Sequence, residues 1–328
     1  MAITFINMLQ YYYAKLSSKQ KEAYIAIYRG MLEFKEEINI PAIPVDDASL
    51  VFNYILLDNP LLFYVTSFTY IYDSNNYTDT IKPSYLCTKN NMLQNIEVIS
   101  RYLMKYDSIK SLNDIDKEFY VHDFCLANFS YDYSFGKHSH SIVGPIMNKT
   151  GVCEGISKYI KLVFDYIGIR SLIVTSRINK PIGGMVDEHA WNIVEINRNF
   201  YHLDVTFDMS ITETQNRYDY FNLTDNHIAK DHEVPSTVPS CNSITNNYFV
   251  MKSSLLSNFT SVSEYMTREL RSGNKQMIFK LGFKYNENTI EQQILEVAKR
   301  VYSSFFLWNF NIEIRCNKEQ GVIELNFS

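Results

Sequence analysis

Three residues of this chain have side chains that could together perform nucleophilic chemistry: Cys153, His189 and Asp204. A cysteine thiolate attacks carbonyl carbons, but it needs a neighbouring base before it becomes a catalyst. An imidazole can be that base, and a carboxylate can hold the imidazole in the useful tautomer. Whether the three act together depends on the elements that carry them.

Cys153 is expected in the first turn of a helix. The stretch 147–151 has the composition of a turn, and Gly168 is a typical helix stop. The free N–H groups and the positive dipole end of a helix start favour a thiolate. A free cysteine there can equally be inert packing, because free cysteines are often buried. Apolar residues recur with the spacing of one helical face at Ile156, Ile160, Val163 and Ile167.

His189 and Asp204 are expected on two paired strands, 188–196 and 200–207. Side chains alternate between the faces of a sheet, so the pairing register decides whether the two residues meet. Pairing Trp191 opposite Asp204 puts the histidine and the aspartate on one face, whereas a shift by one residue separates them. A catalytic pair therefore predicts a loop with an even number of residues, either 197–198 or 196–199.

Three further residues are candidates for supporting roles. Trp191 shares the face of His189 and would shield a histidine–aspartate hydrogen bond from water. His202 shares the face of Asp204 and could form a hydrogen bond near it, although an ordinary buried histidine explains it too. His140 lies in the polar loop 134–141 just before the nucleophile and lines either the entrance of the site or a solvated loop.

The motifs around the three residues resemble those of the transglutaminase-like superfamily. They read GVCEGIS, EHAWNIV and YHLDVTFD in that order, and RYDYFNLTD with the later Asp231–His232 is similar to bacterial proteins of this superfamily. The resemblance implies a papain-like core with Cys153, His189 and Asp204 as its triad. It also implies that the helix containing His122 precedes this core. Phe207 stands where the family usually has Trp, which affects only the packing near the triad.

The fold class expected from these patterns is α+β, with a papain-like or transglutaminase-like core. We predict a mainly helical N-terminal region at 1–110, the catalytic core at 111–235 and a small α/β accessory module at 236–328. In the first region, Ser17 and Gln20 form a capping-box pattern. A strand within 78–87 would lie at a sheet edge because of Pro83. The last module resembles a ferredoxin-like sandwich.

Composition excludes several classes of protein. The chain has 328 residues, of which 46% are hydrophobic and 20% charged, typical of a soluble globular protein. A net charge of −5 and the lack of a basic block argue against nucleic acid as a partner. No stretch reads as a signal peptide or a membrane span, so we expect a cytoplasmic protein that does not bind membranes. The cysteines are scattered and odd in number, typical of reduced thiols: Cys87, Cys125, Cys153, Cys241 and Cys316.

The sequence thus predicts a cysteine hydrolase or acyltransferase that acts on amide bonds of a peptide or protein through a Cys153 thioester. Hydrolysis is favoured over transamidation because water needs no second binding site. The alternative is an inactive module that binds peptides or cell-wall fragments in the same groove. No cofactor and no metal is expected, since no CxxC or HExxH spacing occurs and His122, His138 and His140 lack further ligands. The C-terminal module is a candidate surface for homo-oligomer formation.

Overall fold

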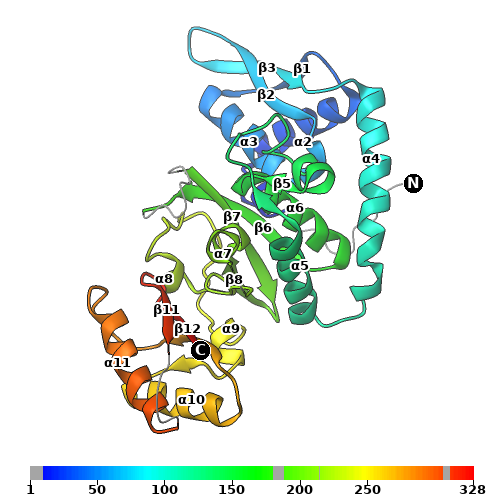
Figure 1. Cartoon of the computed structure of the whole chain (residues 1–328). Coiled ribbons are helices and arrows are strands. Elements are labelled where there is room, and N and C mark those ends of the chain that lie inside the picture. Colours follow the sequence, from blue (N-terminus) through cyan, green and yellow to red (C-terminus); the bar gives the residue numbers. More distant parts are fainter. Residues whose placement is uncertain (1–9, 180–187, 214, 306–310) are drawn as a thin grey trace.

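The computed structural model describes residues 10–179, 188–213, 215–305 and 311–328. Its elements are mixed α and β, in agreement with the α+β class (Figure 1). The N-terminal elements and a small sheet lie at one end, the sheet β6–β8 with its helices lies in the middle, and a C-terminal module lies at the other end. Among the described residues, no helix combines the length and the apolar character needed to cross a membrane.

The N-terminal elements combine helices with a three-stranded antiparallel sheet of order β1-β3-β2. The capping box of Ser17 and Gln20 is present at the start of α2. The expectation of an edge strand around Pro83 was wrong, because β3 is the central strand. The pairing of β3 with β1 extends only to Ile81, so no residue of β1 requires an N–H from Pro83. On its other side, β3 pairs with β2, and there Pro83 lies opposite Phe68. The elements are α1 (Tyr11–Lys15), α2 (Ser18–Glu33), β1 (Ile38–Pro44), α3 (Val45–Asp58), β2 (Val65–Tyr72) and β3 (Tyr77–Tyr85).

The middle part is built on helix α6, which is packed beside the antiparallel sheet β6-β7-β8. Helix α6 begins at Cys153 and ends before Gly168, whose φ of 94° lies in the left-handed region that favours glycine. Both ends of α6 therefore agree with the helix predicted from the sequence. The elements are α4 (Lys89–Leu103), α5 (Asp114–Asn128), β4 (Ser130–Tyr131), β5 (Thr150–Gly151), α6 (Cys153–Ile167), β6 (Arg170–Arg177), β7 (Glu188–Ile196) and β8 (Asn199–Leu203).

The hairpin of β7 and β8 has the register that a catalytic pair requires. Asn192 pairs with Leu203, so the next position along the hairpin sets Trp191 against Asp204. The loop holds only Asn197 and Arg198, both at positive φ, 51° and 66°. This is the backbone of a two-residue turn that matches the twist of the strands. The predicted even loop is confirmed.

The second strand ends earlier than the sequence indicated. We expected it to continue to Phe207, but β8 stops at Leu203 and helix α7 (Val205–Ile211) follows. Val205 and Thr206 have the branched side chains typical of a strand. The side chain of Asp204 overrides that preference, because it accepts a hydrogen bond from the N–H of Phe207 and caps the helix.

One hydrophobic core joins the N-terminal elements to the middle part. It runs from Leu16 through Ile55 and Tyr106 to Phe164 and Phe221 without a break at residue 110. The boundary predicted there stays a prediction, and it does not coincide with a gap between cores. Among the described residues from Leu256 to Phe327, sixteen buried hydrophobic side chains form a separate core.

The C-terminal module is not ferredoxin-like, although it is an α/β unit. Its sheet has the order β11-β12-β10-β9, with β9 parallel to β10 and the other neighbours antiparallel. The first strand has only two residues, and β11 and β12 form a terminal hairpin. The residues predicted to open β11 include Phe310, which lies outside the described residues. Two short helices precede the core of the module, α8 (Asp225–Ile228), whose Ile228 packs with Phe207 and Tyr220 of the middle part, and α9 (Tyr248–Met251). The elements of the module are β9 (Leu255–Leu256), α10 (Phe259–Arg271), β10 (Gln276–Leu281), α11 (Ile290–Ser303), β11 (Ile312–Asn317) and β12 (Val322–Phe327).

Candidate active site

Cys153 is held at the first turn of α6 by a tight backbone contact. The preceding Val152 donates its N–H to the carbonyl oxygen of Ser139 at 3.1 Å. Gly155 lies directly against that same carbonyl, and a Cβ on it would overlap the Ser139 oxygen. The glycine of the GVCEG motif is thus required for close approach of the loop 139–141 to the helix start. Cys153 is 7% exposed and opens into a cavity of about 530 Å³.

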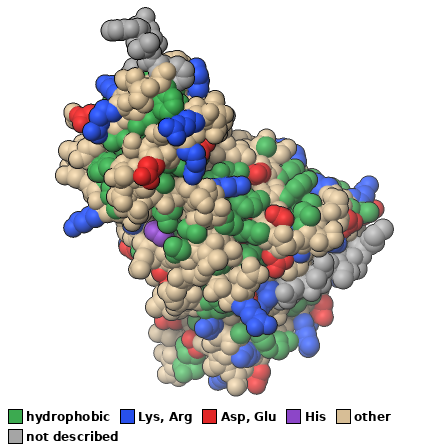
Figure 2. All heavy atoms as spheres, turned by 90° about the horizontal axis from the view of Figure 1, so that it is seen from below, with side chains coloured by type: hydrophobic (Ala, Val, Ile, Leu, Met, Phe, Trp, Pro, Cys, Tyr) green, Lys and Arg blue, Asp and Glu red, His purple; other side chains and the backbone are tan. Residues whose placement is uncertain are grey.

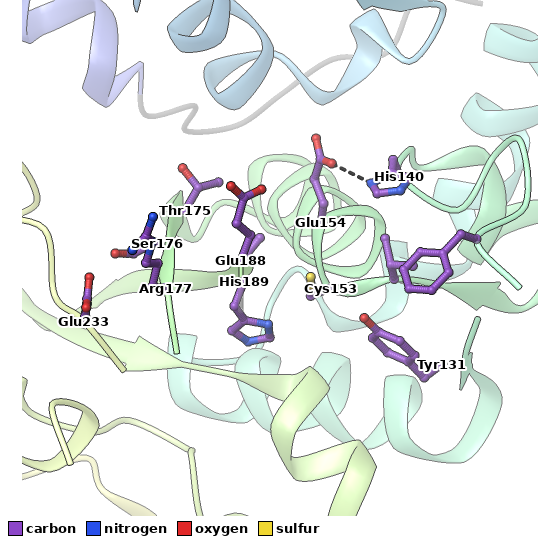
Figure 3. A pocket seen from close by; sticks show the side chains of 13 residues that line it. Tyr131, His140, Cys153, Glu154, Thr175, Ser176, Arg177, Glu188, His189 and Glu233 are labelled. Carbon is purple, nitrogen blue, oxygen red and sulfur yellow. Dashed lines mark hydrogen bonds and ion pairs between the residues drawn. The ribbon is translucent and has the colours of Figure 1, made fainter. Parts of the chain in front are cut away.

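His189 lies on β7 with its ring between Cys153 and Asp204. Its Nε2 is 2.6 Å from Oδ2 of Asp204, and both side chains are buried. Its Nδ1 is buried and has no hydrogen-bond partner among the described residues, while the ring faces the Cys153 sulphur (Figure 3). Burial lowers the pKa of His189, but the charge and hydrogen bond of Asp204 and the contact with Cys153 raise it to about 10. The imidazole is therefore disposed to carry a proton beside the thiol.

Asp204 is shared by two histidines. Its Oδ2 lies 2.6 Å from His189 Nε2 and 3.0 Å from Nε2 of His232, whereas its Oδ1 accepts from the N–H of Phe207. Burial raises the pKa of Asp204, but the two histidines more than offset this and hold it well below its usual range. The carboxylate is therefore ionised and fixed on both oxygens, as an orienting group must be.

His232 is the second histidine of the site, and its two carboxylate partners favour the imidazolium form. Its Nε2 contacts Asp204 at 3.0 Å and its Nδ1 contacts Oδ1 of Asp231 at 2.6 Å. A neutral imidazole has one N–H, so only the protonated ring can donate to two carboxylates. Burial lowers its pKa, but the two carboxylates raise it above the ordinary value. In the sequence, Asp231–His232 belongs to a motif similar to that of bacterial superfamily members, a resemblance that assigns these two residues no role.

Of the predicted supporting residues, Trp191 lies beside the site histidines, whereas His202 lies behind Trp191 and hydrogen-bonds it. Trp191 packs against the rings of His189 and His232, with centroids 6.0 and 5.0 Å away, as a shield would. His202 forms hydrogen bonds with residues other than Asp204. Its Nδ1 accepts from Trp191 and its Nε2 bonds Asp225, at 3.0 and 2.9 Å. It is therefore a buried neutral histidine that orients the tryptophan, and its pKa is lowered, chiefly by burial.

The rim of the cavity carries a charged group on the side of His140. This histidine lines the cavity and its Nδ1 lies 2.9 Å from Glu154, as the dashed line in Figure 3 marks. Lys158 bonds the other oxygen of Glu154 at 2.5 Å. Burial raises the pKa of Glu154, but Lys158 and His140 lower it to about 2. Glu154 is thus a paired carboxylate rather than a free base next to the thiol.

Tyr131 is a site residue that the sequence did not indicate. It follows α5 and reaches the site because β4 pairs in parallel with β5, just before the nucleophile. Its side chain lines the cavity together with Cys153. Burial, with the nearby Cys153 thiol, raises the pKa of Tyr131 above the ordinary value. Figure 3 shows the Cys153 sulphur between the Tyr131 hydroxyl and the His189 ring. No local pattern marks such a residue, because only the fold brings it to Cys153.

Among the described residues, two clusters contain metal-ligating side chains, but neither fits an ion. His189, Asp204 and His232 contact each other at 2.6 and 3.0 Å, whereas an ion bound at about 2.0–2.2 Å to each in tetrahedral geometry would hold them farther apart. In the cluster of His202, Asp225 and Cys241, the Trp191 N–H occupies one ring nitrogen. A metal on the other would leave the imidazole without a proton. The expectation of no metal stays a prediction.

His122 is paired with two carboxylates, Asp208 and Asp123, away from the candidate triad. Within the described part of the chain, it forms no metal-ligating cluster with His138 and His140, the grouping considered from the sequence. Its Nε2 lies 3.0 Å from Asp208 and its Nδ1 3.2 Å from Asp123, with the ring wholly buried. Burial lowers the pKa of His122, but the bonds and charges of the two carboxylates raise it to about 9. A group with a raised pKa stabilises the fold fully below its unfolded pKa, about 6.5, and this stabilisation is lost as the pH rises through the folded value.

We therefore expect the His122 imidazolium to contribute up to about 3 kcal/mol at pH 6 that is lost by about pH 10. Urea unfolding of the native protein and of His122→Gln at pH 6, 8 and 9.5 measures this. The glutamine does not titrate, so the variant should lose less stability over that range. His189 and His232 are present in both proteins. Burial raises the pKa of Asp208 to about 7, so the same comparison is repeated in the Asp208→Asn background, where that carboxyl no longer titrates. An identical pH dependence of the two proteins would contradict the ion pair.

No family model and no curated protein matches this sequence. Solved structures that match include a TGase, with 12% identity, a TM-score of 0.32 and coverage of 48% of each chain. They also include a candidate cysteine protease from Cytophaga hutchinsonii, with 15% identity and a TM-score of 0.27 over 43% of this chain and 61% of that one. The chain thus covers about half of the first structure and less than two thirds of the second.

Proposed function

We propose that this protein is a cysteine-dependent enzyme that transfers or hydrolyses acyl groups of amide bonds, with Cys153, His189 and Asp204 as its triad. One observation carries the proposal: the His189 ring has a buried, unpartnered Nδ1 toward Cys153 and an Nε2 held 2.6 Å from a buried carboxylate. A hydrogen bond between base and nucleophile is often long before substrate binds. The imidazole is therefore disposed to take the thiol proton.

The reaction follows from these positions. The Cys153 thiolate attacks the amide carbonyl, the C–N bond breaks, and the amine leaves with the proton that His189 donates. Water or a second amine then loses a proton to His189 and attacks the thioester, which frees the thiol. The backbone N–H of Cys153, at the start of the helix, is the proposed oxyanion donor, and Tyr131, which lines the cavity beside it, is the proposed second donor. Hydrolysis is favoured, because the same open cavity admits water.

A peptide or protein substrate is supported by two adjoining cavities. The one at Cys153 shares His140 and Glu154 with a second cavity of about 350 Å³ toward the N-terminal elements. The second cavity can take a neighbouring side chain of an extended substrate. Its apolar wall is formed by Leu56, Pro60, Leu62, Phe63, Val65 and Leu86.

Nucleic acid and membranes remain unfavoured as partners. On the face in Figure 2, basic and acidic side chains are interspersed. Homo-oligomer formation through the C-terminal module, a cytoplasmic location and the absence of a cofactor stay predictions. The inactive-module alternative predicted a face mismatch or a plugged groove. Among the described residues, His189 and Asp204 share a face and the cavity reaches Cys153.

The proposal is tested by the rate at which iodoacetamide alkylates each cysteine, measured by peptide mass spectrometry between pH 5 and 9. At pH 7, Cys153 should react at least about ten times faster than the others, because a neighbouring imidazolium and a helix start favour its thiolate. Burial raises the pKa of the other four thiols, which are internal controls: Cys87, Cys125, Cys241 and Cys316.

His189→Ala should remove this advantage, and His138→Ala, a histidine that does not line the cavity, should keep it. Equal rates for all five cysteines in the native protein would leave the binding module as the better account. If Cys153 is activated, a glutamine-containing protein offered with and without a fluorescent primary amine separates the two reactions. Ammonia release without amine incorporation indicates hydrolysis, and incorporation indicates transamidation.

A further inference from the structure

The turn between β11 and β12 of the C-terminal module reaches the catalytic residues through Gln320. This side chain is wholly buried. Its Nε2 donates to Oδ2 of Asp231 and to the carbonyl oxygen of His227, both at 3.0 Å. Its Oε1 accepts from Nζ of Lys280 on β10 at 3.1 Å. With two acceptors facing the nitrogen and a donor facing the oxygen, the orientation of the amide is fixed.

From Asp231 the hydrogen bonds continue to the triad. Asp231 also accepts from the Tyr220 hydroxyl at 2.7 Å and bonds His232 at 2.6 Å, and His232 bonds Asp204 at 3.0 Å. Gln320, Asp231, His232 and Asp204 are each at most 1% exposed. Water therefore does not replace a missing partner, and a carboxylate that loses a donor must turn or pull on its remaining partners.

We infer that Gln320 is a positioning residue for the catalytic carboxylate, so that the C-terminal module completes the active site. The module holds Asp231, Asp231 holds His232, and His232 fixes the oxygen of Asp204 on which His189 also depends. The inference rests on the proposed triad. It goes beyond that proposal because it assigns a catalytic purpose to a module that carries none of the three triad residues.

The module has other contacts that would hold it in place without this chain of hydrogen bonds. Arg217 bonds Glu324 of β12 at 3.1 Å, and Asn317 bonds Asp219 at 3.0 Å. The bond of Arg217 does not reach Asp231, whereas Asn317 also donates to the Tyr220 hydroxyl, at 3.4 Å, and so touches the network only through Tyr220. Burying a fully satisfied polar network costs more than burying apolar side chains of the same shape, so simple docking does not require Gln320.

The charges around His232 determine how its titration should change in the variants. If Asp231 is released, the ring keeps one carboxylate instead of two and holds its second proton less strongly. His232 should then become neutral at a lower pH, and its charge-assisted hydrogen bond to Asp204 should weaken. The titratable groups that face it, from all elements packed against it, are Asp204, His189, His202, Asp231 and Tyr220, with Lys230 and Lys280 next to Asp231.

The test compares Gln320→Glu and Gln320→Leu with Glu324→Gln in the full-length protein. The first variant keeps the size of the side chain and its contact with Lys280 but replaces the donor to Asp231 by an acceptor. The second removes both contacts. Glu324→Gln is the matched control, since it weakens another buried contact of the same module. Circular dichroism and melting temperature establish that each variant is folded.

Two readouts are used. The first is the iodoacetamide rate of Cys153, expected to fall about tenfold in both Gln320 variants and less than twofold in the control. The second is the titration of ¹⁵N-labelled histidine rings by NMR, with His232 assigned from a His232→Gln spectrum. In the native protein His232 should be doubly protonated at pH 7. In Gln320→Leu it should lose its second proton at least one pH unit lower, whereas the added carboxylate of Gln320→Glu opposes that shift.

Native rates in both folded Gln320 variants and a native His232 titration in Gln320→Leu would overturn the inference. Equal losses in Glu324→Gln would overturn it as well, because they would show a general effect of loosening the module. If Cys153 is not activated in the native protein, the proposed function fails. The NMR titration then still decides whether Gln320 controls His232 and Asp204.

Discussion

Replacing Asp204 by Asn should lower acylation of Cys153 by about 10³-fold or more, the largest effect on activity that we expect of any change outside the nucleophile. The substitution changes the histidine tautomer. The amide NH₂ of the new side chain would donate to Nε2 of His189, which would leave the ring proton on Nδ1, toward Cys153. An imidazole protonated on that side cannot accept the proton of the thiol.

The amide can still cap α7, because its oxygen accepts from the N–H of Phe207 as the native Oδ1 does. It cannot balance the charges of His189 and His232, so some loss of stability, about 3 kcal/mol, is expected as well. Activity is therefore compared at a temperature where circular dichroism shows the variant to be folded.

The measurement is a single-turnover reaction with p-nitrophenyl acetate, whose acyl group the thiolate takes as a thioester while nitrophenolate is released. Mass spectrometry of Cys153 identifies the acylated residue. Asp225→Asn is the matched control, because Asp225 also bonds a histidine, His202 at 2.9 Å, without belonging to the triad. A folded Asp204→Asn protein that acylates within tenfold of the native rate would refute the role assigned to this carboxylate.

Of the glycine-to-alanine substitutions near the candidate active site, Gly155→Ala should lower both stability and Cys153 reactivity the most. A Cβ at this position meets the carbonyl oxygen of Ser139, with Ser141 behind it, and both are backbone atoms. Backbone cannot rotate away as a side chain can, so the loop 139–141 must separate from the first turn of α6. That separation breaks the bond from Val152 to Ser139 and moves the start of the helix that carries Cys153.

We expect a loss of about 3 kcal/mol in unfolding free energy, at the upper end of the range for overpacked sites. A fall of about 10²-fold in the alkylation rate of Cys153 should accompany it, since small misplacements of reacting groups have effects of that size. Urea unfolding and the iodoacetamide assay measure the two effects.

Gly30→Ala is the comparison, because Gly30 is also helical and buried but its Cβ would meet only the side chain of Ile38. A side chain can turn aside, and alanine favours the helix by about 1 kcal/mol. Gly30→Ala should therefore be much milder. If both alanines cost the same, close approach of backbone to backbone is not what the glycine at 155 provides.

The parts of the site that the sequence predicted correctly are those that depend on neighbours along the chain. Helix α6 begins at Cys153 and ends before Gly168, because apolar spacing and a left-handed glycine are local signals. The register of β7 and β8 follows from a two-residue turn, and it brings His189 to Asp204. Local signals failed where a side chain competes with propensity, as at Asp204, which starts a helix in a run of branched residues.

By itself, then, the sequence determined the position of Cys153 at a helix start, of His189 and Asp204 on one face of a hairpin, and the α+β class. Only the tertiary structure decided what surrounds them. Tyr131, His232 and Gln320 come from three different elements, and no periodicity or spacing relates them to Cys153. Their partners are chosen by burial, because a buried carboxylate or imidazolium must find a counter-charge or a donor wherever the fold supplies one.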